Sequence, residues 1–173
     1  FFGALTGKEA EAEEAFAEQT EILEEVESGE KTGRTIAFFY VTSNGLIQVR
    51  QSTDYIPKLI ELAGGRYIFE NLEDSGSGRS TLNMQVEDFY AGARDADILI
   101  YNSSIDGGVT TVDELIGKCN ILKDFKAVQE GQVYCTTNDM YQQSMAIGYL
   151  LQDMHMVLTD DDTAKLRYLF LLQ

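Results

Sequence analysis

The stretch "MQVEDFYAGARDADILIY" (residues 84–101) decides the fold of this chain. Its first half reads as a short amphipathic helix that carries Glu87 and Asp88 near its start. A tight connection at residues 94–97 leads into "DILIY", a short apolar run typical of a buried strand. No histidine, nucleophile or paired acid–base set lies within this stretch. It therefore predicts an α/β unit whose purpose is not catalysis.

The same alternation of strands and helices extends through most of the chain. We predict strands at "TIAFFYV" (35–41), "RYIF" (66–69) and "QVYCT" (132–136), helices at 53–65, 111–119, 138–158 and 160–172, and loops at 43–52 and 70–83. Thr53 or Asp54 caps the first of these helices, and a capping box of Thr111 and Glu114 starts the second. This order predicts an α/β fold with a mainly parallel sheet that is flanked by helices.

One long helix is predicted before the α/β part, over residues 6–27. Thr6 and Glu9 form a capping box at its start. Its apolar face carries Ala12, Phe16, Leu23 and Val26. The helix ends at "SGEKTG" (28–33), where two glycines and turn-forming residues predict an internal boundary.

The charge of the chain excludes several classes of partner. The 173 residues include 13 basic and 29 acidic side chains, which gives a net charge of −16. A nucleic-acid-binding protein needs Lys and Arg to neutralise phosphates, so nucleic acid is not an expected partner. The same charge opposes binding to an anionic membrane surface. No apolar stretch approaches the ~20 residues of a membrane span.

The side chains that most enzymes use are scarce in this sequence. His155 is the single histidine, and its apolar surroundings predict a packed structural role. Cys119 and Cys135 lack the CxxC spacing of a metal site. No GxSxG motif is present, so a serine-nucleophile hydrolase has no support either. An enzyme is therefore not expected.

Polar loops follow the predicted strands and offer a binding site instead. They span Ser43–Arg50, Asn102–Asp106 and Thr137–Tyr141. Ligands of open α/β sheets bind outside the carboxyl ends of the strands, where such loops converge. The three loops together supply an arginine, amides, hydroxyls, a carboxylate and an aromatic ring.

Five segments, in this order, resemble those of a known family. They are "GALTGKEAEAEEAF" (3–16), "YIPKLIELAGGRYIFEN" (55–71), "MQVEDFYAGARDADILIY" (84–101), "DFKAVQEGQVYCTTNDMY" (124–141) and "LLQDMHMVLTDDD" (150–162). On these segments the chain resembles the back half of a solute-binding protein of ABC transporters, of the iron-siderophore, haem and cobalamin class. Two positions depart from the family pattern: Ala96 stands where a proline is usual, and Met156–Val157 replaces His–Pro.

The resemblance implies a division of the chain and a role for it. Residues 1–33 would form the rigid inter-lobe helix with its connection, and residues 34–173 the carboxyl-terminal α/β lobe. The family's first lobe would then precede Phe1. The protein would capture an iron-siderophore, haem or a corrinoid outside the cytoplasm, in the periplasm or lipid-anchored on the cell surface. Any membrane contact would come through a lipid anchor outside this chain.

The resemblance also implies site residues. Arg50 is the first candidate for ligand binding, because a guanidinium binds carboxylate or phenolate oxygens bidentately. Tyr141 would stack on a flat ligand, and Asn102, Ser103 and Asp139 are further candidates. Family members dock onto arginines of the membrane permease through a glutamate on each lobe. Glu87 matches that glutamate, so ABC permease subunits are the expected protein partner.

Two other functions remain open on sequence grounds. A subunit of a metal-cluster enzyme can have related two-lobed architecture, but it needs cysteine ligands. A flavodoxin-like interaction domain is the second alternative. In that case residues 34–173 would fold and work without the first helix.

Overall fold

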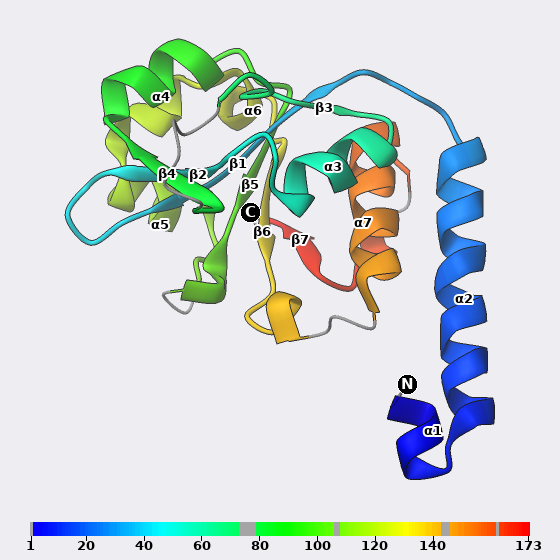
Figure 1. Ribbon diagram of the computed structural model, residues 1–173. Coiled ribbons are helices and arrows are strands. Elements are labelled where there is room, and N and C mark those ends of the chain that lie inside the picture. Colours follow the sequence, from blue (N-terminus) through cyan, green and yellow to red (C-terminus); the bar gives the residue numbers. More distant parts are fainter. Residues whose placement is uncertain (1, 73–78, 106–107, 143–145, 162) are drawn as a thin grey trace.

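The computed structural model of the chain describes residues 2–72, 79–105, 108–142, 146–161 and 163–173. A single seven-stranded sheet organises them, in the order β4-β2-β1-β5-β6-β7, with β3 paired to β1. The strands are β1 (Thr35–Val41), β2 (Ile47–Arg50), β3 (Arg66–Tyr67), β4 (Thr81–Met84), β5 (Ile98–Tyr101), β6 (Val133–Thr136) and β7 (Leu169–Leu171). Figure 1 shows this sheet between two layers of helices.

The predicted α/β fold is confirmed, and its sheet is mixed. Strands β1, β3, β5 and β6 are parallel to one another, as expected of strands joined by helical crossovers. Strands β2, β4 and β7 pair antiparallel to their neighbours and occupy the flanks. The parallel centre is apolar on both faces, and for this reason its strands read as continuous hydrophobic runs.

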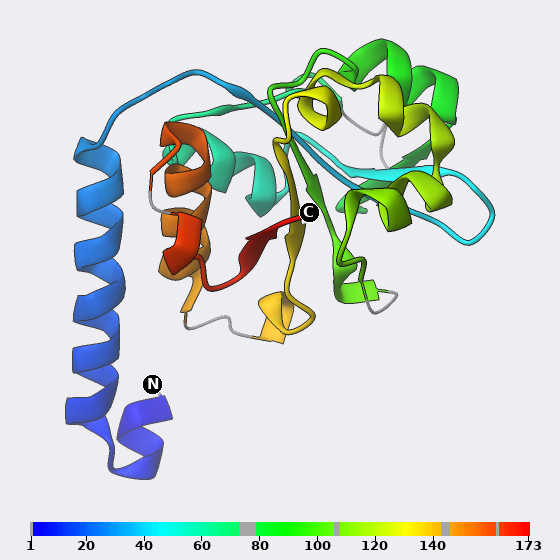
Figure 2. The ribbon, with the colours of Figure 1, turned by 180° about the vertical axis from the view of Figure 1, so that it is seen from behind.

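Helices cover the two faces of the sheet as separate groups (Figures 1 and 2). The α-helices are α1 (Phe2–Thr6), α2 (Glu9–Ser28), α3 (Tyr55–Leu62), α4 (Val86–Ala93), α5 (Val112–Lys118), α6 (Lys126–Gln129) and α7 (Ile147–Thr159). Short 3-10 turns are η1 (Ser103–Ile105), η2 (Asn120–Asp124), η3 (Met140–Gln142) and η5 (Thr163–Lys165). Among the described residues, no helix is both long and apolar enough to cross a membrane.

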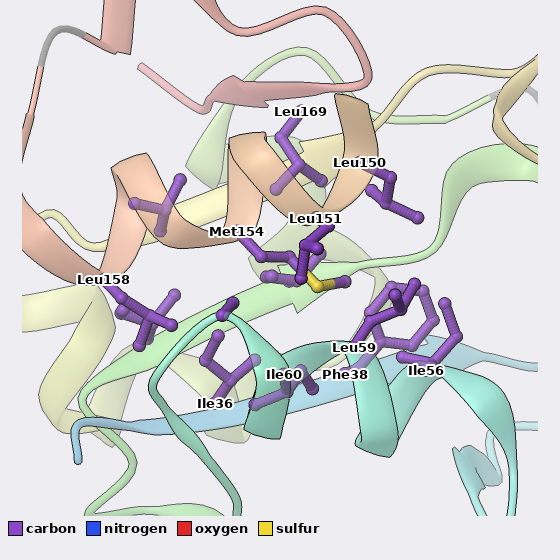
Figure 3. Packing of buried hydrophobic residues seen from close by; sticks show 14 of the residues in the cluster. Ile36, Phe38, Ile56, Leu59, Ile60, Leu150, Leu151, Met154, Leu158 and Leu169 are labelled. Carbon is purple, nitrogen blue, oxygen red and sulfur yellow. The ribbon is translucent and has the colours of Figure 1, made fainter. Parts of the chain in front are cut away.

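Each face of the sheet has its own hydrophobic core. On one face, Ile36 and Phe38 of β1 pack against α3 and α7 (Figure 3). Val26 of α2 belongs to the same core. On the other face, Phe39 of β1 packs against Phe89 of α4, with ring centroids 4.9 Å apart. Alternate residues of one strand therefore serve opposite cores.

Several elements differ from the sequence prediction, including the helix predicted at 138–158, which begins as α7 only at Ile147. Residues 43–52, predicted as a loop, contain β2, which forms a hairpin with β1 around Gly45 (φ +79). The predicted loop at 70–83 overlaps β4, which begins at Thr81. The predicted closing helix at 160–172 is wrong, because its last part forms β7 at the edge of the sheet.

The first helix is shorter than predicted and begins differently. Gly7, with φ +69, separates α1 from α2, and Lys8 is the N-cap of α2. The predicted capping box is therefore wrong, and the Thr6 hydroxyl instead donates to the Gly3 carbonyl oxygen within α1. Phe16 does not face the core but is 70% exposed. Figures 1 and 2 show the beginning of α2, together with α1, extending beyond α7.

Candidate functional site

The site forms where the parallel strands end. Strand β5 ends at Tyr101, and the next residue, Asn102, is buried and donates its N–H to the Phe39 carbonyl oxygen of β1 at 2.8 Å. Strand β6 ends at Thr136, and the segment after it carries Tyr141. Two of the three predicted polar loops, those after β5 and β6, thus lie at this edge, and a ligand role for them stays a prediction.

Arg50 reaches the site from a strand instead of a loop. Val49 of β2 pairs with Phe39, so Arg50 lies next to Phe38 and on the face covered by α3 and α7. Its guanidinium carbon is 5.9 Å from the Phe38 ring centroid and 5.2 Å from that of Tyr141. The guanidinium is therefore held between two aromatic rings, where cation–π attraction is favourable.

Polar contacts join three of the predicted residues into one cluster. Arg50 Nη2 donates to the Tyr141 hydroxyl, and the Tyr141 hydroxyl also bonds the Asn102 side chain. Arg50 Nη1 lies 3.5 Å from Asp54 Oδ2, and both side chains of this ion pair are nearly buried. Asp54 is the N-cap of α3, so the capping residue of a helix also neutralises the arginine.

Tyr67 fixes the backbone beneath the arginine. Its hydroxyl accepts from the Arg50 N–H at 3.0 Å and donates to the Arg50 carbonyl oxygen at 2.8 Å. Because Tyr67 belongs to β3 and Arg50 to β2, these two hydrogen bonds connect two strands that do not pair with each other. Arg50 is thus pre-organised before any ligand arrives.

An apolar cavity of about 390 Å³ adjoins this cluster. Its lining consists of Tyr55, Met140, Tyr141, Ala146, Ile147, Leu150 and Tyr168. Only Tyr141 among these was a predicted site residue. Met140 lies beside Tyr141 in η3, and the others come from the start of α3, from the start of α7 and from the segment before β7, which are distant in sequence and carry no motif.

The tyrosines of this region stay protonated at neutral pH. Burial raises the pKa of Tyr55 to about 12, and the nearby Tyr141 adds to the effect. Burial also raises the pKa of Tyr141 and of Tyr168, although Arg50 acts in the opposite direction on Tyr141. The site therefore offers neutral phenols, which donate hydrogen bonds, instead of phenolates.

Ser103 and Asp139 lie apart from this cluster. Ser103 is buried in η1, its N–H bonds the Thr136 hydroxyl at 3.0 Å, and its own hydroxyl donates to the Thr136 carbonyl oxygen. This position gives Ser103 a role in holding the loop. Asp139 is exposed near the cavity residue Tyr168. Asp106, at the end of the second predicted loop, lies outside the described residues.

Glu87 is exposed in the first turn of α4, where the helix dipole favours a carboxylate. The strand before this helix ends level with β1, because Met84 pairs with Ile47 and Ile47 with Val41. Helix α4 therefore starts at the same edge of the sheet at which β1 ends.

His155, which was predicted to have a packed structural role, contacts the backbone of another part of the chain. His155 Nδ1 is 2.9 Å from the Ala63 carbonyl oxygen, and a Cβ at Gly29 would lie 2.7 Å from Nε2. Cys119 and Cys135 are buried and are not joined by a disulfide. Within the described residues, no group of three or more His, Cys, Asp or Glu side chains could hold a metal ion.

A second, wider hollow of about 710 Å³ lies at the other end of α3. Lys31, Lys58 and Arg66 line it together with Glu61 and Glu70, so charges of both signs alternate along its wall. Lys31 is engaged with the α3 end, since its Nζ donates to the Leu62 carbonyl oxygen at 2.8 Å. None of the predicted ligand residues lies in this hollow.

Comparisons with known proteins show which of them the chain resembles in sequence and in fold. No model of a known protein family matches the chain. Over 146 residues the chain is 29% identical to an uncharacterised lipoprotein of Methanocaldococcus jannaschii. The matched region covers 82% of this chain and 33% of that protein.

Solved structures of TroA-like and ABC-transporter substrate-binding proteins share the fold. The ABC-type Fe³⁺-hydroxamate transport protein of Saccharomonospora viridis matches with a TM-score of 0.68 and 18% identity, over 90% of this chain and 52% of that one. S. aureus IsdE, solved with haem, matches with a TM-score of 0.63 and 16% identity, over 91% and 60%. This chain has the fold of a single lobe of these proteins and spans little more than half of their length.

Proposed function

We propose that this chain is the carboxyl-terminal lobe, with the inter-lobe helix, of the solute-binding component of an ABC importer. In this proposal residues 1–33 are the helix with its connection, and residues 34–173 are the lobe. The observation that carries it is the nearly buried Arg50, joined to Tyr141 and Asn102 beside an apolar cavity at the carboxyl edge of the sheet. The shared fold of substrate-binding proteins supports the same conclusion.

The ligand we propose is an iron complex, either a siderophore or haem, or else a corrinoid. The neighbours of this fold include proteins of hydroxamate transport and of haem binding. A chelated metal fits the site better than a bare ion, because the described residues contain no group of three or more His, Cys, Asp or Glu side chains that could hold an ion. The corrinoid option rests on the sequence resemblance alone.

Each predicted residue receives a role in this proposal. Arg50 and Tyr141 contact the ligand directly, and Asn102 supports the Tyr141 hydroxyl. The exposed Asp139 contacts the ligand from the side of the cavity. Ser103 holds the loop after β5 against β6 and so positions Asn102.

We further propose that Glu87 docks onto the permease from outside the cytoplasm. An exposed carboxylate in the first turn of a helix is presented in a fixed geometry, which suits recognition by an arginine. The lipoprotein relative supports an extracytoplasmic location, in the periplasm or lipid-anchored on the surface.

The alternative functions gain no support. The fold neighbours are solute-binding proteins and not enzymes. A metal-cluster subunit would need reachable cysteine ligands, whereas Cys119 and Cys135 are buried in the hydrophobic core. A flavodoxin-like domain would not need the first helix, but Ile22 and Val26 of α2 are part of the core of this lobe.

Ligand binding to the natural full-length protein tests the proposal. Ferric siderophores, haem and cobalamin are screened by thermal shift, and the best ligand is titrated against Arg50→Ala and Arg50→Lys. A charge-assisted hydrogen bond contributes about 1.5–3 kcal/mol, so Arg50→Ala should weaken binding by at least about tenfold. Arg94→Ala removes an exposed arginine at the C-cap of α4 and serves as the control. Unchanged affinity in Arg50→Ala would refute the assigned site.

The docking role is tested by uptake in cells. Glu87→Ala should reduce transport of the ligand while its affinity for the purified protein stays unchanged. Glu24→Ala removes an exposed glutamate of α2 and should leave both quantities at the wild-type level. Normal transport by Glu87→Ala would rule out this docking role.

A further inference from the structure

Two short strands share one side of β1. Ile36 pairs with Tyr67 of β3 and also with Ile98 of β5, so β3 and β5 lie on opposite sides of β1. Strand β2 also lies on the side away from β5, because the order in the sheet is β2-β1-β5. Strands β3 and β2 therefore follow each other along the same edge of β1, with β3 at residues 35–36 and β2 at residues 39–41.

Arg50 lies at the junction between these two strands. The pairing of β1 with β2 ends at Phe39 and Val49, one residue before Arg50. On its other side Arg50 pairs with Thr81 of β4. Backbone N–H and C=O groups inside a protein need hydrogen-bond partners. On the side of β1, the backbone of Arg50 is thus left to a partner other than a regular strand pair.

The Tyr67 hydroxyl is that partner. It accepts from the Arg50 N–H at 3.0 Å and donates to the Arg50 carbonyl oxygen at 2.8 Å. One phenol can do both, because it has an O–H donor and free lone pairs. Tyr67 is 3% exposed, and its ring packs edge-on against Phe69 with the centroids 5.9 Å apart. The position of the hydroxyl is therefore set by the packing of the lobe.

Different groups hold the tip of the Arg50 side chain. The guanidinium carbon lies 5.2 Å from the Tyr141 ring centroid, and Nη1 lies 3.5 Å from Asp54 Oδ2. An anionic group of a ligand adds or exchanges contacts at this tip, whereas the bonds to Tyr67 are made by the backbone and stay in place. Because the backbone geometry restricts the rotamers of a side chain, the Tyr67 hydroxyl limits the directions in which the guanidinium can point.

We infer that Tyr67 is a positioning residue, whose hydroxyl holds the Arg50 backbone so that the guanidinium meets the ligand in a fixed orientation. This inference rests on the proposed function and adds to it a residue that acts only through Arg50. A purely structural hydroxyl would stabilise the lobe whatever side chain stood at position 50. A positioning hydroxyl affects binding only while that side chain is an arginine.

Tyr67→Phe in the natural full-length protein tests the inference without a ligand, because it removes the hydroxyl and keeps the ring. Hydrogen exchange at the Arg50 amide should rise about five- to tenfold, the effect of losing one hydrogen bond. The NMR signal of the Arg50 Nε–H group should also shift. Tyr134→Phe is the matched control, because Tyr134 is 2% exposed in the same core but belongs to β6. It should leave both Arg50 signals unchanged, and urea unfolding reports the stability of each variant.

A double-mutant cycle with Arg50 tests the effect on binding. The probe is whichever of haem, a ferric trihydroxamate and cobalamin binds the wild-type protein most tightly. Tyr67→Phe should weaken its binding by about three- to tenfold in the wild-type background. In the Arg50→Ala background the same change should weaken binding by less than about twofold, because the residue that Tyr67 positions is already absent. Tyr134→Phe should leave the affinity unchanged in both backgrounds.

The possible failures are distinguishable. If a probe binds and Tyr67→Phe leaves the Arg50 amide exchange and the Nε–H signal unchanged, the inference is overturned and the importer proposal stands. The same conclusion follows if Tyr67→Phe weakens binding equally in the wild-type and the Arg50→Ala backgrounds. If none of the three probes binds the protein, the proposed function fails and the inference fails with it.

Discussion

Gln19 of α2 caps α7 from another part of the chain, because its Oε1 accepts a hydrogen bond from the Gly148 N–H at 2.8 Å. Helix α7 begins at Ile147, and its N-cap residue Ala146 offers no side-chain hydrogen bond. A helix start leaves several N–H groups without a partner, and here α2 supplies the missing acceptor. Glu18 of α2 adds a bond to the Tyr149 hydroxyl. These hydrogen bonds thus hold α2 against α7, whose first residues line the cavity of the candidate site.

This contact predicts that Gln19→Ala destabilises the protein by about 0.5–2 kcal/mol, the usual effect of losing a helix cap. The midpoint of urea unfolding measures the loss, and hydrogen exchange at the Gly148 amide should speed up. Glu21→Ala, at an exposed position of the same helix, is the control and should leave the midpoint unchanged. Unaltered exchange at Gly148 in Gln19→Ala would show that the cap contributes nothing.

Asp97 joins the beginnings of two central strands. Its carboxylate accepts from the Thr35 N–H at 2.7 Å, from the Thr35 hydroxyl at 2.8 Å and from Lys126 Nζ at 2.6 Å. Burial favours the protonated form, but the hydrogen bonds from Lys126 and Thr35 outweigh it and lower the pKa of Asp97 from 3.8 to about 2. The folded state therefore binds this proton more weakly than the unfolded state does.

The sign of the resulting pH dependence is fixed. The contribution of Asp97 is fully present above about pH 4 and is lost as the pH falls towards 2. Asp97→Asn should lower the free energy of unfolding at pH 7 by about 1–2 kcal/mol, after allowance for partial exposure. The variant should also lose part of the stability change between pH 4 and pH 2. Asp95→Asn alters an exposed carboxylate two residues away and should keep the wild-type profile.

The sequence predicted the elements whose signals are local. The run 35–41 is continuous and apolar because both faces of β1 are buried, and its predicted bounds agree with the structure. Asp54 and the Thr111–Glu114 box mark helix starts through bonds between neighbouring residues, and both predictions are confirmed. Strands β2 and β4 were missed because each has four residues with little of the apolar pattern of the central strands.

Long-range contacts explain the remaining errors. The segment 160–172 has helical spacing, but its end is drawn into the sheet by pairing with β6. Arg50, Asn102 and Tyr141 were predicted because strand ends gather polar residues, and the structure brings these three together, while their ligand role stays a prediction. Tyr55 and Tyr168 could not be found, because their proximity depends on how α3 and β7 pack and not on any local motif.

The capping box of α5 predicts a measurable coupling. Thr111 Oγ1 accepts from the Glu114 N–H at 3.1 Å, and Glu114 Oε2 accepts from the N–H groups of Thr110 at 2.7 Å and Thr111 at 3.4 Å. Thr111→Ala and Glu114→Ala should each cost about 0.5–1.5 kcal/mol. Their double variant should cost less than the sum, since each residue fixes the other. Asp113→Ala, in the same turn, should instead be additive with Thr111→Ala.

Asp153 organises the end of the chain. This buried carboxylate of α7 accepts three successive backbone N–H groups, from Arg167 at 2.9 Å, Tyr168 at 2.6 Å and Leu169 at 3.0 Å. Three donors on one carboxylate set where β7 begins. They also fix the backbone of Tyr168, a residue of the cavity.

Asp153→Ala should therefore release β7 as well as alter the cavity. The three freed N–H groups lose their acceptor inside the protein, so we expect a loss of stability on the order of 3 kcal/mol. Hydrogen exchange at residues 169–171 should rise towards the rate of the unfolded chain, while exchange in β1 follows only the global stability. Affinity for the best ligand of the thermal-shift screen should fall together with the order of Tyr168, whereas Asp124→Ala, at an exposed aspartate of η2, should change none of these quantities. Intact protection of β7 in Asp153→Ala would mean that pairing with β6 alone suffices to hold the strand.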